Sequence, residues 1–387
     1  MRDSRITRRA FVRSASTAVA AGAAIALPAS GAHAQEAAAG EMPMRKLGKT
    51  DLMVSVASLG SFGLTNPGVL EAALDAGVNL IDTGPGYGEG NAERAVGQAM
   101  QKRRDEAVLS TKFAGGADAT KEQLLSGLDG SLKRLQTDHV DIVQIGMADP
   151  GHFANTAFFE AFREAKAAGK ARFMGFSAHG DVPNVVTEGI GHDDVAVAMV
   201  KYNVMEQEGL NDVLAKAAER SVGVFVMKAG AGNREAEDRQ LVEGVDAEGA
   251  KVRWALSNAN IASVCCRMLS FEDVDKFVAA VKKPLTEADL DFLERYRQRF
   301  ATAYCRACGS CSAGCPQQVA VADIMRYHMY FRYYGFEKEA MRLYAQLPEE
   351  RRAGACAGCT GGCTASCPYG LSTKANMVEA DGLLTLA

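Results

Sequence analysis

Short apolar runs rich in β-branched residues alternate with stretches of helical period from about residue 45 to residue 283. This alternation is typical of a parallel sheet covered by helices, because each buried strand is followed by an amphipathic helix. The pattern predicts eight strands, at 54–60, 79–82, 107–112, 140–146, 171–177, 196–202, 223–228 and 261–266.

Helical stretches are predicted between these strands at 93–103, 120–135, 158–168 and 210–219. Thr120 opens the second of them, with an acid in the first turn and basic residues in the last, which agrees with helix polarity. Eight strand–helix units over residues 45–283 predict a single (β/α)8 TIM barrel. An open doubly wound sheet is the alternative, but no G-x-G-x-x-G motif follows the first strand.

Residues 301–387 form a different region, which contains two cysteine runs that each end in Cys-Pro. The first run has the C-x2-C-x2-C-x3-C-P spacing of two-cluster ferredoxins, in which the fourth cysteine binds the other cluster. The second run has the spacing x2, x3, x3, one residue longer. We therefore predict two [4Fe–4S] clusters, with ligands Cys305, Cys308, Cys311, Cys315, Cys356, Cys359, Cys363 and Cys367.

Disulfides and zinc are the alternatives for these cysteines. Three cysteines within seven residues can hardly all find acceptable disulfide partners, because disulfide geometry is restrictive. Zinc also binds paired C-x2-C units, but the triple followed by Cys-Pro is poor zinc spacing. The remaining pair, Cys265 and Cys266, lies in an apolar run and is interpreted as small buried hydrophobic residues.

The N-terminus has the features of an export signal. Arg8 and Arg9 precede an Ala-rich apolar stretch and a small-x-small site that ends at Ala34. This predicts a twin-arginine signal peptide at 1–34 and a flexible linker at 35–44; an ordinary secretory signal with two neighbouring arginines is the alternative. Because the twin-arginine route carries folded proteins with inserted cofactors, the cysteine runs favour it, and the expected location is the periplasm.

The formal net charge of −4 becomes −8 when cleavage removes five arginines and one aspartate. An acidic mature chain without basic runs argues against nucleic acid or anionic lipid as a partner. No other segment is apolar for long enough to span a membrane.

Three residues at the ends of neighbouring predicted strands suggest acid–base chemistry. Asp82 ends the second strand, Tyr87 follows it in a Gly-rich loop, and Lys112 ends the third. A buried ammonium beside a phenol stabilises phenolate and makes the phenol a better proton donor. Without further information, however, a tyrosine in a Gly-rich loop is usually structural.

Residues 45–283 resemble the aldo/keto reductase family, most clearly at 81–97, 110–112, 141–144, 175–177 and 254–258. The resemblance implies that Tyr87 protonates a developing alkoxide, Lys112 lowers its pKa and Asp82 holds Lys112. It also implies NADP(H) bound over the barrel mouth. The cysteine-rich region resembles the C-terminal iron–sulfur domain that one branch of this family carries, with an α-helical ferredoxin-like fold.

The chain departs from the family pattern in two places. Gly146 stands where the family has a histidine that polarises the carbonyl, and His179 is the best substitute, with His152 weaker. At the nucleotide site Arg267 replaces a glycine, so NADP(H) is doubtful. The remaining candidate contacts to a nucleotide are Ser177, Lys228, Arg267 and Glu272.

Together these features predict an exported iron–sulfur oxidoreductase that acts on a small carbonyl or alcohol compound and exchanges electrons with a redox partner protein or electron donor. The alternative is a decayed barrel that serves as an electron carrier or binds a partner. A connecting helix at 284–300 is expected to lay the tail, with helices at 322–334 and 337–346, against the barrel. Whether the clusters lie near Tyr87 and Lys112 decides between the two.

Overall fold

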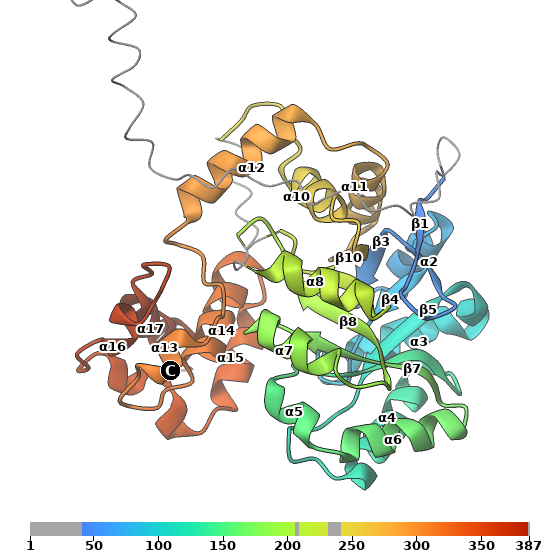
Figure 1. Cartoon of the computed structure of the whole chain (residues 1–387), viewed down its shortest axis with the longest axis horizontal. Coiled ribbons are helices and arrows are strands. Elements are labelled where there is room, and N and C mark those ends of the chain that lie inside the picture. The colour runs from blue at the N-terminus through green and yellow to red at the C-terminus, as the bar shows by residue number, and fades with distance from the viewer. Residues whose placement is uncertain (1–40, 206–208, 231–240, 386–387) are drawn as a thin grey trace, which may run out of the picture.

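The computed structural model describes residues 41–205, 209–230 and 241–385. The predicted signal peptide at 1–34 and most of the linker at 35–44 lie outside the described residues. The described chain forms a barrel of strands surrounded by helices, followed by an all-helical region of residues 287–384 (Figure 1).

Eight parallel strands close into a barrel in the order β10-β3-β4-β5-β6-β7-β8-β9. The predicted (β/α)8 barrel is therefore confirmed. The strands are β3 (Ala57–Gly60), β4 (Leu80–Asp82), β5 (Val108–Lys112), β6 (Val140–Ile145), β7 (Ala171–Ala178), β8 (Val195–Lys201), β9 (Gly223–Met227) and β10 (Ile261–Cys266).

The first predicted strand, 54–60, is wrong as a single element. The chain splits it into β2 (Met53–Ser55), which pairs antiparallel with β1 (Met44–Lys46), and the barrel strand β3. Leu47 and Leu52 of this hairpin are buried in the same hydrophobic cluster as the inward-facing Phe225. The hairpin therefore closes the end of the barrel at which the strands begin. The continuous apolar run at 54–60 contributes to two separate sheets.

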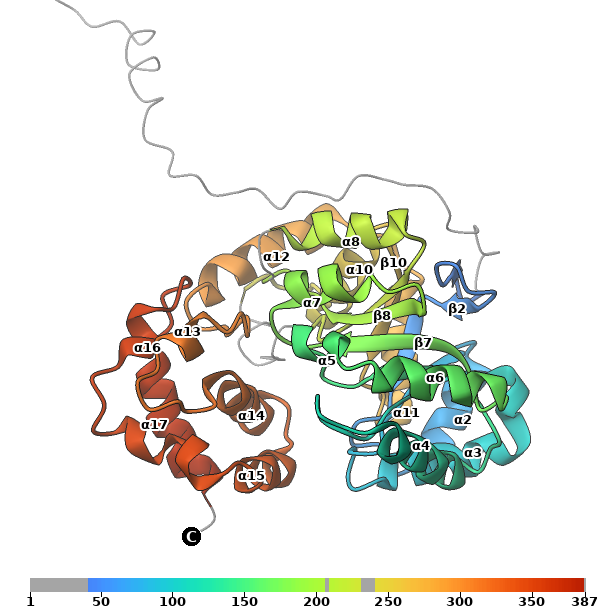
Figure 2. The same ribbon diagram turned by 60° about the horizontal axis from the view of Figure 1, so that its bottom comes forward.

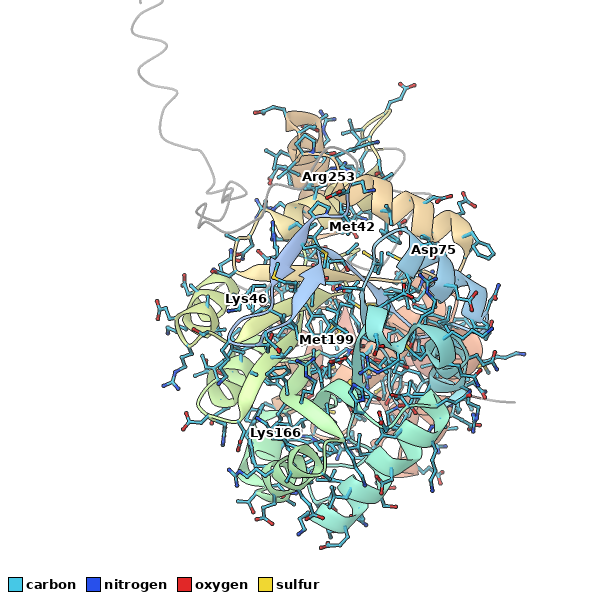
Figure 3. All side chains as sticks on the ribbon, turned by 90° about the vertical axis from the view of Figure 1, so that its right-hand side faces the viewer. Met42, Lys46, Asp75, Lys166, Met199 and Arg253 are labelled. Carbon is cyan, nitrogen blue, oxygen red and sulfur yellow. The ribbon has the colours of Figure 1, made fainter. Side chains whose placement is uncertain are left out.

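Helices cover the outside of the barrel, and Figure 3 shows Met199 within it while Lys166 and Asp75 lie on the outer layer. Thr120 caps the helix of 121–135 in a capping box with Gln123, as its sequence predicted. The outer helices are α2 (Pro67–Asp75), α3 (Asn91–Arg103), α4 (Lys121–Leu135), α5 (Pro150–Ala154), α6 (Ala157–Ala167), α7 (Val182–Gly189), α8 (Leu210–Glu219), α10 (Ala247–Leu256) and α11 (Phe271–Val281).

Helix α12 (Glu287–Phe300) connects the barrel to the tail and is anchored by a buried ion pair. Arg253 of α10 donates to both carboxylate oxygens of Asp289, at 3.0 and 2.7 Å. The tail then forms its own hydrophobic core around Ile324, Tyr344 and Met377. Its helices are α13 (Ser310–Ala313), α14 (Val321–Tyr333), α15 (Glu337–Ala345), α16 (Gly362–Ala365) and α17 (Thr373–Leu384).

The tail lies beside the barrel, with α14 on the side that faces it (Figure 2). Three contacts fix this position. Arg267 donates to the Tyr334 carbonyl at 2.6 Å, Asn203 donates to the Tyr304 hydroxyl at 3.0 Å, and Lys228 lies 3.4 Å from the Tyr330 hydroxyl. The barrel residues in these contacts follow the carboxyl ends of β10, β8 and β9, so the tail covers the barrel mouth. Among the described residues, no helix has the length and apolarity needed to span a membrane.

Candidate functional site

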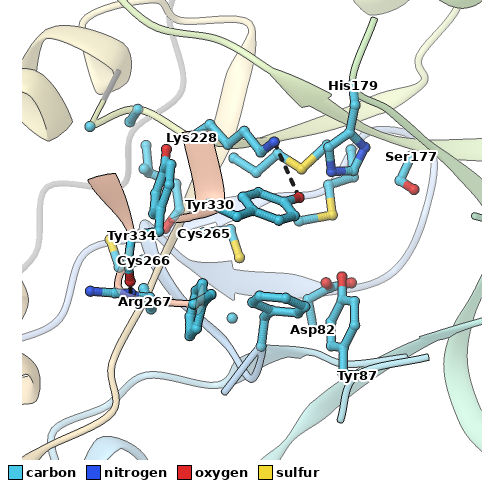
Figure 4. Close-up of a pocket in the computed structure, with 18 of the residues that line it drawn as sticks. Asp82, Tyr87, Ser177, His179, Lys228, Cys265, Cys266, Arg267, Tyr330 and Tyr334 are labelled. Carbon is cyan, nitrogen blue, oxygen red and sulfur yellow. Dashed lines mark hydrogen bonds between the residues drawn. The ribbon is translucent and has the colours of Figure 1, made fainter. Parts of the chain in front are cut away.

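A cavity of about 370 Å³ lies at the barrel mouth, beneath the tail. Its walls come from the strand ends on one side and from α14 and α15 on the other (Figure 4). Active sites of (β/α)8 enzymes form at this end of the barrel. Here the tail completes the site, so the cavity belongs to both regions of the chain.

The structure brings Asp82, Tyr87 and Lys112 together in this cavity. The Lys112 ammonium lies 2.7 Å from Asp82 Oδ2 and 2.7 Å from the Thr83 carbonyl, both as hydrogen-bond donor. It also lies 4.9 Å from the centre of the Tyr87 ring. The side chains of Asp82 and Lys112 are buried, whereas Tyr87 is half-buried.

Burial disfavours the charge on Lys112, but Asp82 and Tyr87 outweigh it and raise the pKa of the ammonium. Burial also raises the pKa of the Tyr87 phenol, and the Lys112 charge opposes this only in part. Lys112 thus lowers the phenol pKa as the sequence predicted, but burial outweighs this effect and leaves the phenol protonated. Tyr87 is thus held as an acid beside a permanent positive charge, which stabilises phenolate once a proton leaves.

Gln144 supports this set and was missed as a functional residue by sequence reasoning. Its amide donates to Asp82 Oδ1 at 2.8 Å and to the Ser110 hydroxyl at 2.6 Å, so both oxygens of the Asp82 carboxylate are occupied. The sequence feature that could have identified Gln144 is its position in the segment 141–144, one residue before the end of a strand. Only the barrel register, which places Gln144 beside Lys112, shows its target.

Gly146 offers no side chain at the position where a histidine was expected. A Cβ atom at Gly146 would meet Lys112 at an ordinary contact distance of 3.5 Å, so a side chain could begin there without a clash. His179 lines the same cavity, whereas His152 is buried in the capping box of α5 and does not. Burial and the charge of Lys228 hold the pKa of His179 well below its usual value, and its Nδ1 has no hydrogen-bond partner among the described residues.

Lys228 and Tyr330 form a second phenol–ammonium pair on the tail side of the cavity. The two groups lie 3.4 Å apart, and the ammonium lies 4.9 Å from the ring centre. Burial lowers the pKa of Lys228 to about 8. Burial raises the pKa of Tyr330, but Lys228 and Arg326 outweigh it and lower that pKa below its usual value.

Three of the four residues expected to contact a nucleotide line the main cavity, but each of them is engaged by another part of the chain. The Ser177 hydroxyl lines the cavity but accepts from the Met147 amide at 3.1 Å, and Lys228 faces Tyr330. Arg267 packs 5.0 Å from the Phe336 ring centre while it donates to the Tyr334 carbonyl. Glu272 is exposed and lies outside the cavity. The tail therefore covers the part of the mouth where a nucleotide was expected to lie.

The two cysteine runs interleave in the tail. Cys305, Cys308 and Cys311 of the first run line a small cavity together with Cys367 of the second. Burial, together with the neighbouring thiols of Cys315, Cys363 and Cys359, raises the pKa of Cys356 to about 11. Each group therefore combines three cysteines of one run with the fourth cysteine of the other run.

The donor chemistry of these two groups fits [4Fe–4S] clusters. All ten cysteines are free thiols, so no disulfide links them. Four thiols in each group are the soft donor set that a cubane needs, and cluster binding would deprotonate them.

The group of Cys305, Cys308, Cys311 and Cys367 lies next to the barrel. The Ala307 carbonyl accepts from the Asp181 amide at 3.2 Å, and the Arg306 carbonyl accepts from the Lys201 ammonium. Asp181 follows His179 by two residues, and His179 lines the main cavity. The first cysteine run therefore contacts a loop that also forms the wall of the site.

Cys265 and Cys266 are placed differently from each other. Cys266 is 3% exposed and packs in the main core, as expected of a small hydrophobic residue. Cys265 is half-buried and also lines the cavity, where burial raises the pKa of its thiol well above the usual value. It is therefore a neutral thiol on the wall of the site.

The barrel is similar to proteins of a known family. The profile of the aldo/keto reductase family matches residues 67–241. The chain is 31% identical over 182 residues to the oxidoreductase YqkF of Bacillus subtilis, covering 43% of this chain and 58% of YqkF. It is 26% identical over 283 residues to the L-galactose dehydrogenase of Arabidopsis thaliana, covering 62% of this chain and 88% of that protein.

A solved structure of an aldo-keto reductase from Bacillus halodurans, in its holo form, has the same fold. Its TM-score is 0.58 at 24% identity, and the match covers 66% of this chain and 96% of that one. The match thus extends over nearly the whole of that protein.

Proposed function

We propose that this chain, whose barrel is similar to the aldo/keto reductase family, is an iron–sulfur oxidoreductase that reduces or oxidises a small carbonyl or alcohol compound. One observation carries the proposal. The cavity that holds Tyr87 and Lys112 is closed by the same tail whose first cysteine run contacts its wall. Proton donors and an electron route therefore meet at one site.

In this proposal Tyr87 donates a proton to the substrate oxygen. Lys112 stabilises the phenolate that remains, and Asp82 with Gln144 keeps the ammonium in place. The neutral imidazole of His179 lies free to donate to the same oxygen, which substitutes for the family histidine that Gly146 replaces. The tail covers the cavity that holds these groups.

Two [4Fe–4S] clusters would be held by the interleaved cysteine groups and would supply or accept single electrons. NADP(H) is not part of the proposal, because Arg267 is engaged with the tail and Glu272 lies outside the cavity. An external one-electron carrier, protein or small molecule, would refill the clusters. It need not enter the barrel.

The test compares the reduced clusters with NADPH as the source of electrons. Protein loaded with clusters is reduced with dithionite and desalted under anaerobic conditions, and a panel of small carbonyl compounds is then added while cluster absorbance and EPR are followed. We expect some of these compounds to reoxidise the clusters. NADPH should show no fluorescence change on addition of the protein and no turnover.

Two results would contradict the proposal. If no carbonyl or alcohol compound changes the redox state of the clusters, while a carrier protein does so rapidly, the barrel is not an enzyme. If NADPH binds and supports turnover without clusters, the electron route is the nucleotide.

We further propose that the chain is exported through the twin-arginine route with its clusters in place. The support is the Arg8-Arg9 pair before an apolar stretch, together with eight candidate cluster ligands that would have to be loaded before transport. The full chain is expected in the periplasmic fraction, and an Arg8→Lys/Arg9→Lys variant in the cytoplasm. An unchanged distribution in that variant would leave an ordinary secretory signal.

A further inference from the structure

The cavity contains a second proton-donor set that no family pattern assigns. Tyr330 of α14 and Lys228, directly after β9, stand 3.4 Å apart. Figure 4 shows the Tyr330 hydroxyl pointing into the same space as the Tyr87 hydroxyl. One phenol comes from the tail and the other from the barrel, each with its own lysine.

The pair is held in place from both sides. Tyr330 is 9% exposed, and the Arg326 guanidinium lies 5.9 Å from its ring centre. Lys228 has a left-handed backbone with φ of 59°, and its carbonyl accepts from Asn203 at 3.0 Å. A non-glycine residue in that conformation costs about 1 kcal/mol or more and is typical of functional sites.

Lys228 has no carboxylate partner among the described residues, so its charge is directed at Tyr330 and at the cavity. In this respect it differs from Lys112, which Asp82 neutralises. Between the two phenols lies Phe62, whose ring centre is 5.0 Å from that of Tyr87 and 5.7 Å from that of Tyr330. The space therefore has an aromatic floor with a proton donor at each end.

Electron delivery from clusters restricts the substrate. Such clusters pass single electrons and bring no hydride, so every proton must come from the protein or from solvent. After one electron, an isolated ketone holds the charge on a single carbon–oxygen unit. A conjugated dicarbonyl spreads the charge over its whole ring, and it needs one proton at each of its two oxygens.

We propose, resting on the proposed function, that the substrate is a conjugated dicarbonyl compound of the quinone class, with Tyr87 donating to one oxygen and Tyr330 to the other. The compound takes two electrons, one at a time, from the clusters, which an external one-electron reductant refills. Two protons leave the phenols, two O–H bonds form, and the product is the dihydroxy compound. Solvent then reprotonates the two phenolates, which Lys112 and Lys228 stabilise in the meantime.

Binding of 1,4-naphthoquinone to the cluster-loaded, oxidised protein tests this assignment without turnover. Isothermal titration calorimetry is expected to show that Tyr330→Phe weakens binding about tenfold, because one buried hydrogen bond is lost. Tyr333→Phe is the matched control, because Tyr333 lies on the same helix but does not line the cavity. Its affinity should equal that of the wild type.

The single-turnover experiment adds a second readout. With reduced, desalted protein, Tyr330→Phe should slow cluster reoxidation by the quinone at least about 100-fold, as expected for loss of a general acid. If Tyr330→Phe binds and reacts like the wild type, the assignment is overturned. If simple ketones reoxidise the clusters in a Tyr87-dependent way while the quinone does not bind, this inference fails and the proposed function stands. If neither class reoxidises the clusters, the proposed function fails, and unchanged quinone binding in Tyr330→Phe still overturns the second donor.

Discussion

Replacement of Tyr87 by phenylalanine is expected to slow reoxidation of the reduced clusters by a carbonyl substrate about 10² to 10⁴-fold, the usual contribution of a positioned general acid. The ring and its contact with Phe62 remain, so the cavity keeps its shape. What disappears is the hydroxyl that Lys112 stabilises as phenolate. Single-turnover absorbance of the desalted, reduced protein measures the effect.

Lys112→Met sharpens the same prediction. It removes the charge that stabilises the phenolate but leaves the phenol, so the rate should fall by an amount close to that of Tyr87→Phe. The double variant should be scarcely slower than either single variant, because the two residues act as one unit. If the two single variants instead slowed the rate by independent factors that multiply in the double variant, Lys112 would not act through Tyr87. Its role would then be structural, as the ion-pair partner of Asp82. Tyr333→Phe should retain the wild-type rate.

The barrel could be predicted almost completely from the sequence because its strands are buried on both faces. Seven of the eight predicted strands lie within one or two residues of those observed, since continuous apolar runs between helical stretches are distinctive. The run at 54–60 failed for the same reason. A continuous apolar pattern does not reveal that the chain bends at Val56, between the hairpin and the barrel strand.

The candidate site was predictable only where local sequence carries it. Asp82 and Lys112 stand at strand ends, and parallel strands in a barrel bring such ends together. Tyr330, by contrast, lies 102 residues from Lys228 and reads as helix packing within an aromatic run. Its role depends on how the tail docks on the barrel, which rests on long-range contacts such as Asn203 with Tyr304.

The tail also changes the meaning of residues that a barrel alone would present differently. Arg267 would face a nucleotide phosphate on an uncovered mouth, but here its guanidinium stacks on Phe336 and donates to the Tyr334 carbonyl. A Cβ atom at Gly63 would come within 2.8 Å of Phe336, so the first loop of the barrel has also made room for the tail. The sequence departures at the nucleotide site thus go together with the docked tail, because Arg267 contacts the tail where it would otherwise face a nucleotide.

Paired cysteine substitutions are expected to separate the two clusters according to the interleaved arrangement. Cys367→Ala should remove the group that contains Cys305, and Cys315→Ala the group that contains Cys356. Each single variant should lose about four of eight irons. Because Cys305 and Cys367 belong to one group, Cys305→Ala/Cys367→Ala should lose no more iron than either single variant. Cys305→Ala/Cys315→Ala should lose nearly all of it.

The opposite pattern would mean that each run binds its own cluster. In that case Cys305→Ala/Cys315→Ala would keep half of the iron, and Cys305→Ala/Cys367→Ala would lose both clusters. Cys266→Ala is the control, because this cysteine is buried in the barrel core far from either run in sequence.

Electron transfer to the substrate distinguishes the two cysteine groups further. Reoxidation by substrate should stop when the group beside Asp181 is lost through Cys367→Ala, since the cysteine run of that group contacts the wall of the cavity. With Cys315→Ala the near cluster remains, and one electron per chain should still reach the substrate.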